Sequence, residues 1–372
     1  MLRTRTFLFV GIVLAALLAL PALNVARSLQ AGRSPSWTPG ALLNTGAPAS
    51  WRNYVLYRAG ISASPAEVVV GREGWLYLGD KYEGTLTASQ RGQTAADVDK
   101  AIRIGAAAQA WDAWMKQHGG VKLYRVLVGP NKTSVYPEYL PRWARPAASA
   151  PMDALVSRAA PWYVDPRPAL LHAKSGGAEL LYFRTDTHWT QLGAAVAFQA
   201  FAEAVAPHAP DIRWPQERSM RLQTVGPLHE GDLTGLLRLN HWLADVEPQV
   251  GVTSEPLHTT EHDYLTGRLL REGQNAAIQD PKRTLLVTSR GALNQRKVLW
   301  LRDSFGSDLA PLMAATFSET LQLHWNRPLA QPADLAQLIA AWRPDYVFVT
   351  VVERDALTGP FMNPPPSGAG RS

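Results

Sequence analysis

The amino-acid sequence predicts an α/β domain whose β-sheet is mostly parallel and covered by helices on both faces. Runs of strand length alternate with helical patterns over most of the 372 residues. Several strand-like runs, such as 346–352, are almost continuously apolar, as parallel strands are when both of their faces are buried, and 121–128 is also read as a buried strand. The content of 46% hydrophobic and 18% charged residues is typical of a globular protein.

The amino terminus predicts a membrane anchor over residues 1–30. Arg3 and Arg5 precede an uncharged, mostly apolar run over residues 7–26, and about 20 such residues are needed to cross a bilayer. The positive flank favours a cytoplasmic amino end. A cleaved signal peptide is the alternative, because Pro21 interrupts the run and small residues follow it. The length of the run favours the anchor, and in both cases the rest of the chain is exported.

A linker is expected over residues 31–64, because its first part is rich in Ser, Pro, Gly and Ala. A β-hairpin is expected over 68–78, where two apolar stretches flank a glycine-containing turn. A long helix is expected over 94–118, because apolar residues recur at helical spacing and two glycines follow. The strand 121–128 then runs into the loop 130–132.

The second half of the chain continues the alternation of strands and helices. A helix is expected over 191–205, and residues 206–280 are irregular and expected to hold a small β subdomain. The other segments with a clear pattern are strands at 284–288, 297–301 and 346–352 and a helix at 308–317. The domain is expected to cover 65–358, and the tail 359–372, bounded by Pro and Gly, is expected to be disordered.

Two polar segments hold the parts of a nucleophilic site. Asp186 and His188 are two residues apart, which in an extended segment places both side chains on one face. Ser304 follows an apolar run and precedes a helical pattern, so its hydroxyl is expected on a turn. A serine needs a base to take its proton, and that base needs a carboxylate to orient it. Since ligands bind at the carboxyl ends of strands in such sheets, where both segments are expected, the three residues predict a Ser-His-Asp triad.

Each of these residues also has a structural interpretation. Ser304 is suited to a helix N-cap, and Asp303 to a cap or loop brace. An isolated histidine such as His188 is more often structural than catalytic. Asp186 and His188 also suit a divalent metal ion, but no second histidine stands at a ligand spacing from His188, so no metal site is expected.

The order of these segments and the residues in them resemble the alginate O-acetyltransferase family of AlgJ and AlgX, whose catalytic domain is related to the SGNH hydrolases. In that family the Asp-x-His segment precedes the serine segment, which is the reverse of ordinary SGNH enzymes. Other parts of the chain are similar to the same family, and its length and amino terminus are closer to AlgJ. These parts are the hairpin motif 71–78, the Pro-x-Lys loop 130–132 with its continuation to 141, and the Gly-Asp-Leu segment 231–233.

The resemblance implies a three-layer SGNH-hydrolase-like domain with permuted motif order. It implies Ser304 as nucleophile, His188 as base and Asp186 as the residue that orients the base, without cofactor or metal. It further implies an O-acetyltransferase that modifies an exported polysaccharide through an acetyl-serine. Its expected location is the bacterial inner membrane with the catalytic domain in the periplasm, and its expected partner is a membrane-bound O-acyltransferase that supplies acetyl groups.

Four further residues are candidates for binding substrate. Asn131 and Lys132 lie on a loop after a strand and suit an oxyanion donor or a substrate contact, or else a turn with a solvated lysine. Arg302 stands where the family has a small residue, and it suits either a uronate carboxylate or a pairing with Asp303. Trp189 suits a platform for stacking a sugar ring, if it is exposed. The first oxyanion donor expected is the backbone N–H of Ser304.

Charge and cysteine content narrow the choice of partners. The net charge of +6 suits an acidic polysaccharide, although many exported proteins are mildly basic. The basic residues are scattered and no nucleic-acid motif is present, so a nucleic-acid partner is not expected. The absence of cysteine excludes disulfides, thiol chemistry and thiolate-bound zinc.

Two other functions fit the same residues. An acetyl esterase would use the same triad, because transfer and hydrolysis differ only in whether a sugar hydroxyl or water attacks the acyl-enzyme. A non-catalytic scaffold that binds polysaccharide in a secretion complex would not use Ser304 at all. The sequence does not name the polysaccharide.

Overall fold

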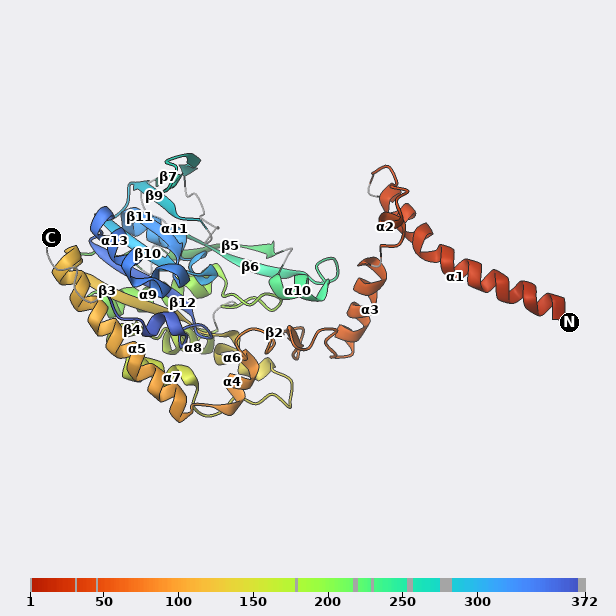
Figure 1. The fold of residues 1–372 in the computed structure, drawn as a ribbon, viewed down its shortest axis with the longest axis horizontal. Helices are drawn as coiled ribbons and strands as arrows, with labels where there is room; N and C mark the ends of the chain where they lie inside the picture. The colour runs from red at the N-terminus through yellow and green to blue at the C-terminus, as the bar shows by residue number, and fades with distance from the viewer. Residues whose placement is uncertain are drawn as a thin grey trace.

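The computed structural model describes a body built on a β-sheet, from which one long helix, α1, projects (Figure 1). It describes residues 2–30, 32–44, 46–177, 180–216, 220–228, 231–252, 257–274 and 283–366. The body is built on an eight-stranded sheet with the order β4-β3-β12-β10-β11-β9-β7-β8. The strands from β4 to β11 in this order run parallel, and β9, β7 and β8 are added antiparallel at one edge. The prediction of a mostly parallel sheet is confirmed.

The strands β3, β9, β10 and β12 lie where the apolar runs predicted them, whereas β11, which lies between β10 and β9, was not predicted. The bounds of the sheet strands in chain order are β3 Leu123–Gly129, β4 Tyr163–Val164, β7 His258–Asp263, β8 Leu269–Gln274, β9 Leu285–Arg290, β10 Asn294–Arg302, β11 Phe317–His324 and β12 Tyr346–Val352. β3 and β12 are buried along their whole length, because helices cover both faces of the sheet.

Alternate side chains of each strand pack on opposite helical layers. On one face Leu127 and Phe348 belong to the core under α8 (Arg167–Ser175), α9 (Gln191–Val205) and α11 (Ala310–Thr316). On the other face Val126 and Val349 pack with the second group of helices. That group comprises α5 (Ala95–Trp114), α7 (Pro151–Arg158), α12 (Asn326–Ala330) and α13 (Pro332–Trp342). The body is therefore a three-layer α/β/α domain.

Most of the other predicted elements are present with shifted ends. The hairpin is β1 (Val68–Val70) paired antiparallel with β2 (Leu76–Leu78). The predicted helix 94–118 is α5, capped by Thr94 and Asp97, followed by a π-helical turn at Met115–Gly119. The remaining short helices are α4 Thr85–Arg91, α6 Lys132–Val135 and α10 Asp232–Leu237.

The region 206–280 does not form the separate β subdomain that was expected. β5 (Met220–Leu228) and β6 (Asp245–Val252) form an antiparallel ribbon that reaches from the body towards α10 (Figure 1). β7 and β8 instead extend the main sheet, because β7 pairs with β9 over its whole length. The predicted region includes 217–219, 229–230, 253–256 and 275–280, which lie outside the described residues.

The amino-terminal part agrees with the predicted anchor and differs from the predicted linker. α1 covers Leu2–Gln30, and its stretch Phe9–Gln30 is long and apolar enough to cross a membrane. The expected linker 31–64 contains two helices, α2 (Pro39–Leu42) and α3 (Gly46–Arg58). The linker prediction is therefore wrong for α3, which is ordered because it packs on the body through the buried side chain of Asn53.

The carboxyl-terminal tail was expected to be disordered from residue 359. Gly359–Met362 instead forms a 3₁₀ turn whose Phe361 is buried in the core. Asn363 then accepts a hydrogen bond from the Trp111 indole at 2.9 Å through its main-chain oxygen. One aromatic anchor among glycines and prolines is therefore enough to order the start of the tail, and 367–372 lie outside the described residues.

Candidate active site

Ser304 stands on a 3₁₀ turn directly after the central strand β10. Asp303 is the N-cap of this turn, and its carboxylate accepts hydrogen bonds from the backbone N–H of Phe305 at 2.9 Å and of Val352 at 2.7 Å. Its second oxygen also accepts from the Trp325 indole at 3.3 Å. Asp303 therefore braces the turn, and Ser304 is presented at the carboxyl ends of the parallel strands, where ligands bind in such folds.

The loop that carries Asp186 and His188 is fixed between a β-bridge and the start of α9. Tyr182 and Trp189 pair across the loop, and Thr190 caps α9 with its hydroxyl. The buried Trp189 indole donates to the main-chain oxygen of Phe305 at 3.0 Å. This bond joins the histidine loop directly to the serine turn, although the two residues are 116 positions apart.

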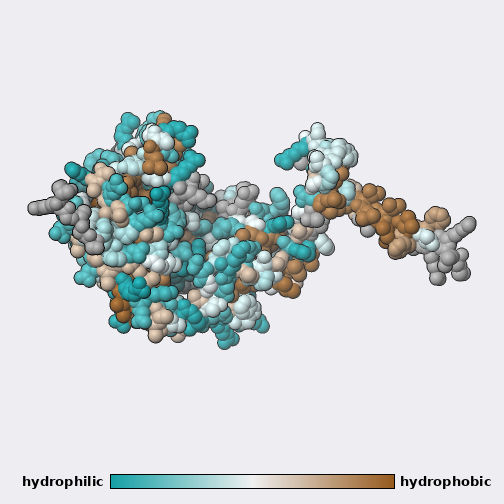
Figure 2. All heavy atoms as spheres, in the orientation of Figure 1, coloured by the Kyte–Doolittle hydropathy of each residue, from teal (hydrophilic) through white to brown (hydrophobic). Residues whose placement is uncertain are grey.

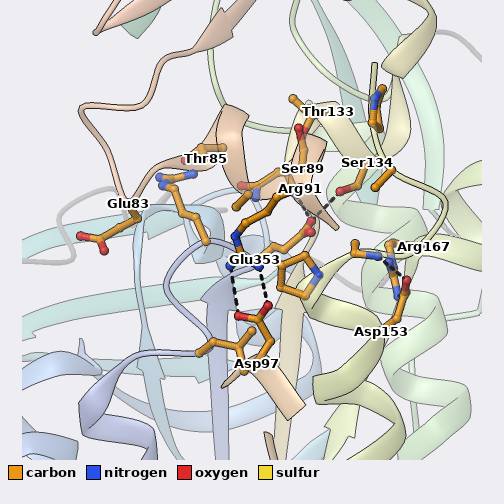
Figure 3. A pocket seen from close by; sticks show the side chains of 18 of the residues that line it. Glu83, Thr85, Ser89, Arg91, Asp97, Thr133, Ser134, Asp153, Arg167 and Glu353 are labelled. Carbon is orange, nitrogen blue, oxygen red and sulfur yellow. Dashed lines mark hydrogen bonds and ion pairs between the residues drawn. The ribbon is translucent and has the colours of Figure 1, made fainter. Parts of the chain in front are cut away.

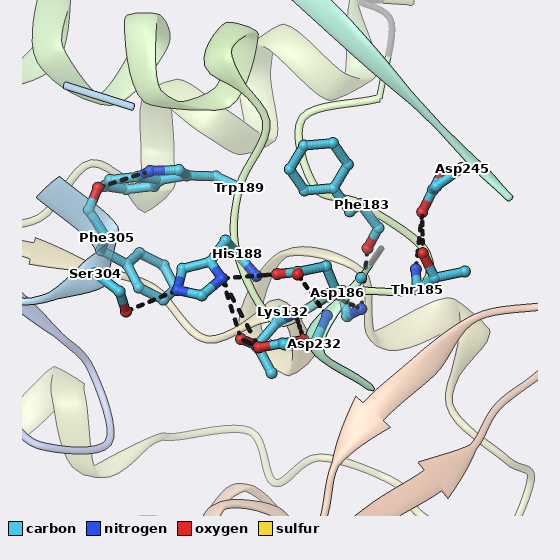
Figure 4. Close-up of polar contacts among 12 residues, drawn as sticks. Lys132, Phe183, Thr185, Asp186, His188, Trp189, Asp232, Asp245, Ser304 and Phe305 are labelled. Atoms are coloured by element: carbon cyan, nitrogen blue, oxygen red, sulfur yellow. Dashed lines mark hydrogen bonds and ion pairs between the residues drawn. The ribbon is translucent and has the colours of Figure 1, made fainter. Parts of the chain in front are cut away.

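The three predicted residues are in hydrogen-bonding contact (Figure 4). His188 Nε2 lies 2.7 Å from Ser304 Oγ, and His188 Nδ1 lies 2.7 Å from Asp186 Oδ1. A carboxylate only accepts, so Nδ1 carries the imidazole hydrogen and Nε2 is left to accept from the serine hydroxyl. This arrangement can activate Ser304 as a nucleophile.

A second carboxylate, Asp232, completes the network on the Asp186 side of the imidazole. The Asp232 backbone N–H donates to Asp186 Oδ2 at 2.7 Å, and its carboxylate lies 3.8 Å from His188 Nδ1. Asp232 also accepts from the N–H of Thr187 at 2.8 Å and from the Thr187 hydroxyl. The motif 231–233 was noted in the sequence, but nothing there predicted that it contacts the triad.

The electrostatics of the network keep Asp186 charged. Burial alone would raise the pKa of Asp186, but the hydrogen bond and charge of His188 and the backbone donors lower it to about 2. Burial alone would lower the pKa of His188, but the hydrogen bond and charge of Asp186, with Asp232 and Asp308, raise it above its ordinary value. Asp186 therefore stabilises the protonated imidazolium form of His188, which is the form that a general base adopts when it takes a proton.

Two more carboxyl groups stand near this network and were not predicted. Burial, with the charges of neighbouring Glu247 and Asp186, raises the pKa of Asp308 to about 7 against the opposing effects of His188 and Arg302. Burial also raises the pKa of Glu247. The sequence shows that Asp308 stands one turn after Ser304. It does not show that the Asp308 carboxyl group is enclosed by the fold.

Lys132 is corrected from a substrate contact to a buried support of the catalytic loop. Its ammonium donates to three main-chain oxygens, those of Phe183 at 2.9 Å, Arg184 at 3.2 Å and Asp186 at 2.6 Å. Burial lowers the pKa of Lys132 to about 8, although nearby carboxylates including Asp232 counteract it. All three donors of the ammonium are occupied, so none is available to a ligand.

Arg302 and Trp189 are also wrong as substrate contacts, because both are fully buried. Arg302 donates to Gln322 at 2.9 Å and to the main-chain oxygen of Asp303 at 3.1 Å, and so binds the serine turn from inside. It therefore pairs with the main chain of Asp303. Trp189 packs on the Phe305 ring, with centroids 4.9 Å apart.

A cavity of about 450 Å³ opens beside the loops that follow β3 and β12, and none of the triad residues lines it (Figure 3). Asn131 and Arg354 line it, and they also line a smaller hollow that reaches Lys132 and Thr187 in the triad loop. The Arg354 guanidinium lies 6.0 Å from the centre of the Phe305 ring. Of the sequence-predicted binding residues, Asn131 is therefore the one that lines this cavity, although most of its surface is buried.

The cavity has few uncommitted charges. Arg91 is paired with Asp97 at 2.6 Å, and Arg167 with Asp153 at 2.7 Å. The buried Glu353 carboxylate accepts from the Asn131 N–H at 2.7 Å and from a serine hydroxyl. Arg354, by contrast, makes no hydrogen bond or ion pair with any residue that the structure describes. Its cation is free to bind a ligand.

One group of described side chains has ligand atoms close enough for a metal ion, namely Asp186, His188 and Asp232. All four carboxylate oxygens of this group already accept hydrogen bonds from backbone or side-chain donors. Both ring nitrogens of His188 are engaged as well. The group is thus arranged as a hydrogen-bond network that orients an imidazole.

The comparisons with known proteins define the class. A family model described as "SGNH hydrolase-like domain, acetyltransferase AlgX" matches residues 68–279, more than half of the chain. The fold is that of an SGNH hydrolase-like domain, and the chain belongs to the AlgX family of acetyltransferase domains. The matched stretch includes Asp186, His188 and Asp232 and ends before Ser304.

Within this class, the curated relatives that the chain matches are AlgJ proteins. The chain is 30% identical over 186 residues to the probable alginate O-acetylase AlgJ of Pseudomonas syringae pv. tomato, covering 49% of this chain and 44% of the relative. It is 29% identical over 250 residues to the AlgJ of Pseudomonas fluorescens, covering 65% of this chain and 58% of the relative. The chain thus spans about half the length of these relatives, and AlgJ is the branch that it resembles more closely.

Solved structures with little sequence identity share the fold. The structure of Bacillus cereus PatB1 with a sulfonyl adduct matches with a TM-score of 0.55 and 14% identity, covering 80% of this chain and all of that chain. A DHHW family protein from Eubacterium siraeum matches with a TM-score of 0.52 and 14% identity, covering 81% of this chain and 100% of that chain. Both support the SGNH-like architecture.

Proposed function

We propose that this protein is an O-acetyltransferase that moves acetyl groups onto hydroxyls of an exported polysaccharide through an acetyl-Ser304 intermediate. The observation that carries the proposal is the unbroken chain of hydrogen bonds from Ser304 Oγ through His188 to Asp186. The names of the curated relatives, alginate O-acetylases, support acetyl transfer to a polysaccharide.

In the proposed reaction His188 Nε2 takes the hydroxyl proton while Ser304 Oγ attacks the carbonyl carbon of an acetyl donor. The imidazolium then protonates the leaving group, and acetyl-serine remains. A sugar hydroxyl next gives its proton to His188 and attacks the acetyl carbonyl. The acetyl group leaves on the sugar oxygen, and the proton returns to Ser304 Oγ.

The oxyanion that forms in each step needs donors about 3 Å away. The Ser304 backbone N–H is the first proposed donor, because it begins the 3₁₀ turn and donates to no other described residue. The Asn131 side chain is proposed as a second donor, since it stands on the loop after β3, whose last residue Gly129 lies against the Phe305 ring.

The acceptor polysaccharide is proposed to enter through the cavity lined by Asn131 and Arg354. Arg354 is its free cation nearest to the serine turn, and an arginine fork suits the carboxylate of an acidic sugar. The proposal also includes α1 as an inner-membrane anchor, with the body in the periplasm. A membrane-bound acyltransferase that supplies acetyl groups belongs to the same proposal and rests on the family resemblance.

Trapping the intermediate tests the proposal. The wild-type protein is mixed with 4-nitrophenyl acetate, quenched in acid and digested, and the peptide that contains Ser304 is examined by mass spectrometry. We expect an acetyl group on Ser304 in wild type, and none in Ser304→Ala. Transfer to an acidic oligosaccharide without release of free acetate separates an acetyltransferase from an esterase. A polysaccharide-binding scaffold would give no acetyl-serine.

A further inference from the structure

The segment that follows α1 exposes large apolar side chains next to arginines. Trp37 is 71% exposed, Trp51 is 61% exposed and Val55 is 47% exposed. Trp51 and Val55 are four residues apart on α3 and so share one side of that helix. Large exposed apolar side chains that share one side of a helix in this way suit an interaction surface.

The other side of α3 is fixed to the body. Asn53 donates to the main-chain oxygen of Leu237 at 2.9 Å, and Ser50 donates to that of Arg238 at 2.7 Å. Tyr54 stacks on Trp242 with centroids 4.5 Å apart. Because these contacts set the rotation of α3, the outward direction of Trp51 and Val55 is a fixed property of the fold.

The start of α3 is also held close to the end of α1. Asn24, near the carboxyl end of the apolar helix, donates to the main-chain oxygens of Leu42 at 2.8 Å and Asn44 at 2.9 Å. α3 then runs crosswise to α1, between that helix and the body (Figure 1). A helix in this position lies along the surface of any bilayer that α1 crosses. Figure 2 shows that apolar surface continues along α1, beyond the segment that connects α1 to the body.

The charge of this region has one sign. No Asp or Glu occurs before Glu67, whereas Arg27, Arg33, Arg52 and Arg58 follow the apolar core of α1. Trp at the level of the headgroups and Arg beside anionic lipid are the two side-chain preferences of a membrane surface. α3 carries both kinds of side chain, which suits it to lie against the headgroups.

We propose that α3 lies on the outer surface of the membrane that α1 spans, with Trp51 and Val55 among the lipid headgroups and Arg52 and Arg58 against lipid phosphates. This contact fixes the body at the membrane in one orientation, with the β5–β6 ribbon and α10 on the membrane side. The proposal rests on α1 spanning the membrane and does not depend on the reaction at Ser304.

The natural absence of cysteine makes a direct test possible. Val55→Cys is made in the full chain, labelled with the fluorophore NBD and reconstituted into vesicles of phosphatidylcholine with phosphatidylglycerol. The matched control is Ile102→Cys on α5, where the native side chain is 51% exposed and far from α1. We expect blue-shifted emission and quenching by nitroxide-labelled lipid at position 55, and neither at position 102.

Three outcomes would overturn the proposal. Quenching of the position 55 label by aqueous iodide as strongly as at 102 would place α3 in water. Shielding from both iodide and nitroxide lipid would place α3 against a protein, either a partner or a second copy. We expect the double substitution Arg52→Gln with Arg58→Gln to reduce the lipid quenching at position 55 at least twofold. Unchanged quenching would show that the arginines do not contribute to the contact with lipid. Resistance of every variant to carbonate extraction confirms first that α1 is inserted.

Discussion

The ammonium of Lys132 donates to the main-chain oxygen of Asp186 at 2.6 Å, so a buried lysine supports the loop that holds the carboxylate of the triad. The same ammonium bonds the carbonyls of Phe183 and Arg184 and lies over the rings of Trp75 and Tyr77 at 5.6 and 5.4 Å. The early hairpin is thereby connected to the catalytic loop. Residues far from the chemistry in sequence thus fix the position of Asp186.

Replacing this lysine is expected to damage both stability and catalysis. Lys132→Met removes the donors to three buried carbonyls, and each unpaired buried group costs about 1–3 kcal/mol. We expect a clear fall in melting temperature and a loss of kcat on 4-nitrophenyl acetate. Lys81→Met is the control, because Lys81 forms a surface ion pair with Glu67 and lies over the Tyr82 ring at the surface. Equal effects of the two substitutions would contradict the supporting role of Lys132.

The pH dependence of activity follows from the pKa of His188. The base must be neutral to act, and its pKa lies above the ordinary histidine value because Asp186 outweighs burial. Activity is therefore expected to rise with pH, with a midpoint above that ordinary value. Asp186→Asn removes the charge that counteracts burial, so the pKa of His188 falls and the midpoint should move to lower pH. We also expect kcat to fall on the order of 10⁴-fold. A midpoint that stays in place would show that another group titrates.

The second carboxylate should have a smaller effect than the first. Asp232→Asn retains the backbone donor to Asp186 Oδ2 but removes a charge 3.8 Å from His188 Nδ1. We expect a loss of about tenfold in kcat from one weakened electrostatic contact and a small shift of the pH midpoint to lower values. Pre-steady-state acetylation rates for Asp186→Asn and Asp232→Asn measure both effects. A loss as large as that of Asp186→Asn would make Asp232 an equal partner.

The free arginine in the cavity should select for charged acceptors. Arg354→Gln is expected to raise KM for an acidic oligosaccharide about tenfold while hydrolysis of 4-nitrophenyl acetate stays unchanged, because a desolvated arginine–carboxylate contact contributes about that much. Arg103→Gln, on the exposed side of α5, is the control. The account of the cavity fails if a neutral oligosaccharide suffers the same rise in KM.

Much of the fold could be predicted because its signals are local. The continuous apolar run of β12 and the helical pattern of α9 have the same bounds in the sequence and in the structure. The contact between Ser304 and His188 was predicted from their residue types and from the family resemblance. Each of the two residues follows a buried strand or bridge, which the local sequence pattern indicates. α3 was missed because its order comes from a contact with Leu237, 184 residues away from Asn53.

The substrate contacts were harder to predict, because burial is a property of the whole fold. Lys132, Arg302 and Trp189 carry the chemistry of binding residues, yet each is enclosed and bonded to main-chain oxygens near the site. Arg354 had no local pattern to identify it, since its importance comes from the cavity and from Phe305. Polar side chains beside a catalytic motif are therefore as apt to support the loops as to touch the substrate.

The measurement that tests the central claim most directly is acetylation of an acidic polysaccharide in cells that lack the protein and are supplied with wild type or Ser304→Ala. The account predicts full acetylation with wild type and none with Ser304→Ala, although the variant is present at the same level in the membrane. Normal acetylation by Ser304→Ala would contradict it, and so would more acetylation in cells without the protein than in cells with it.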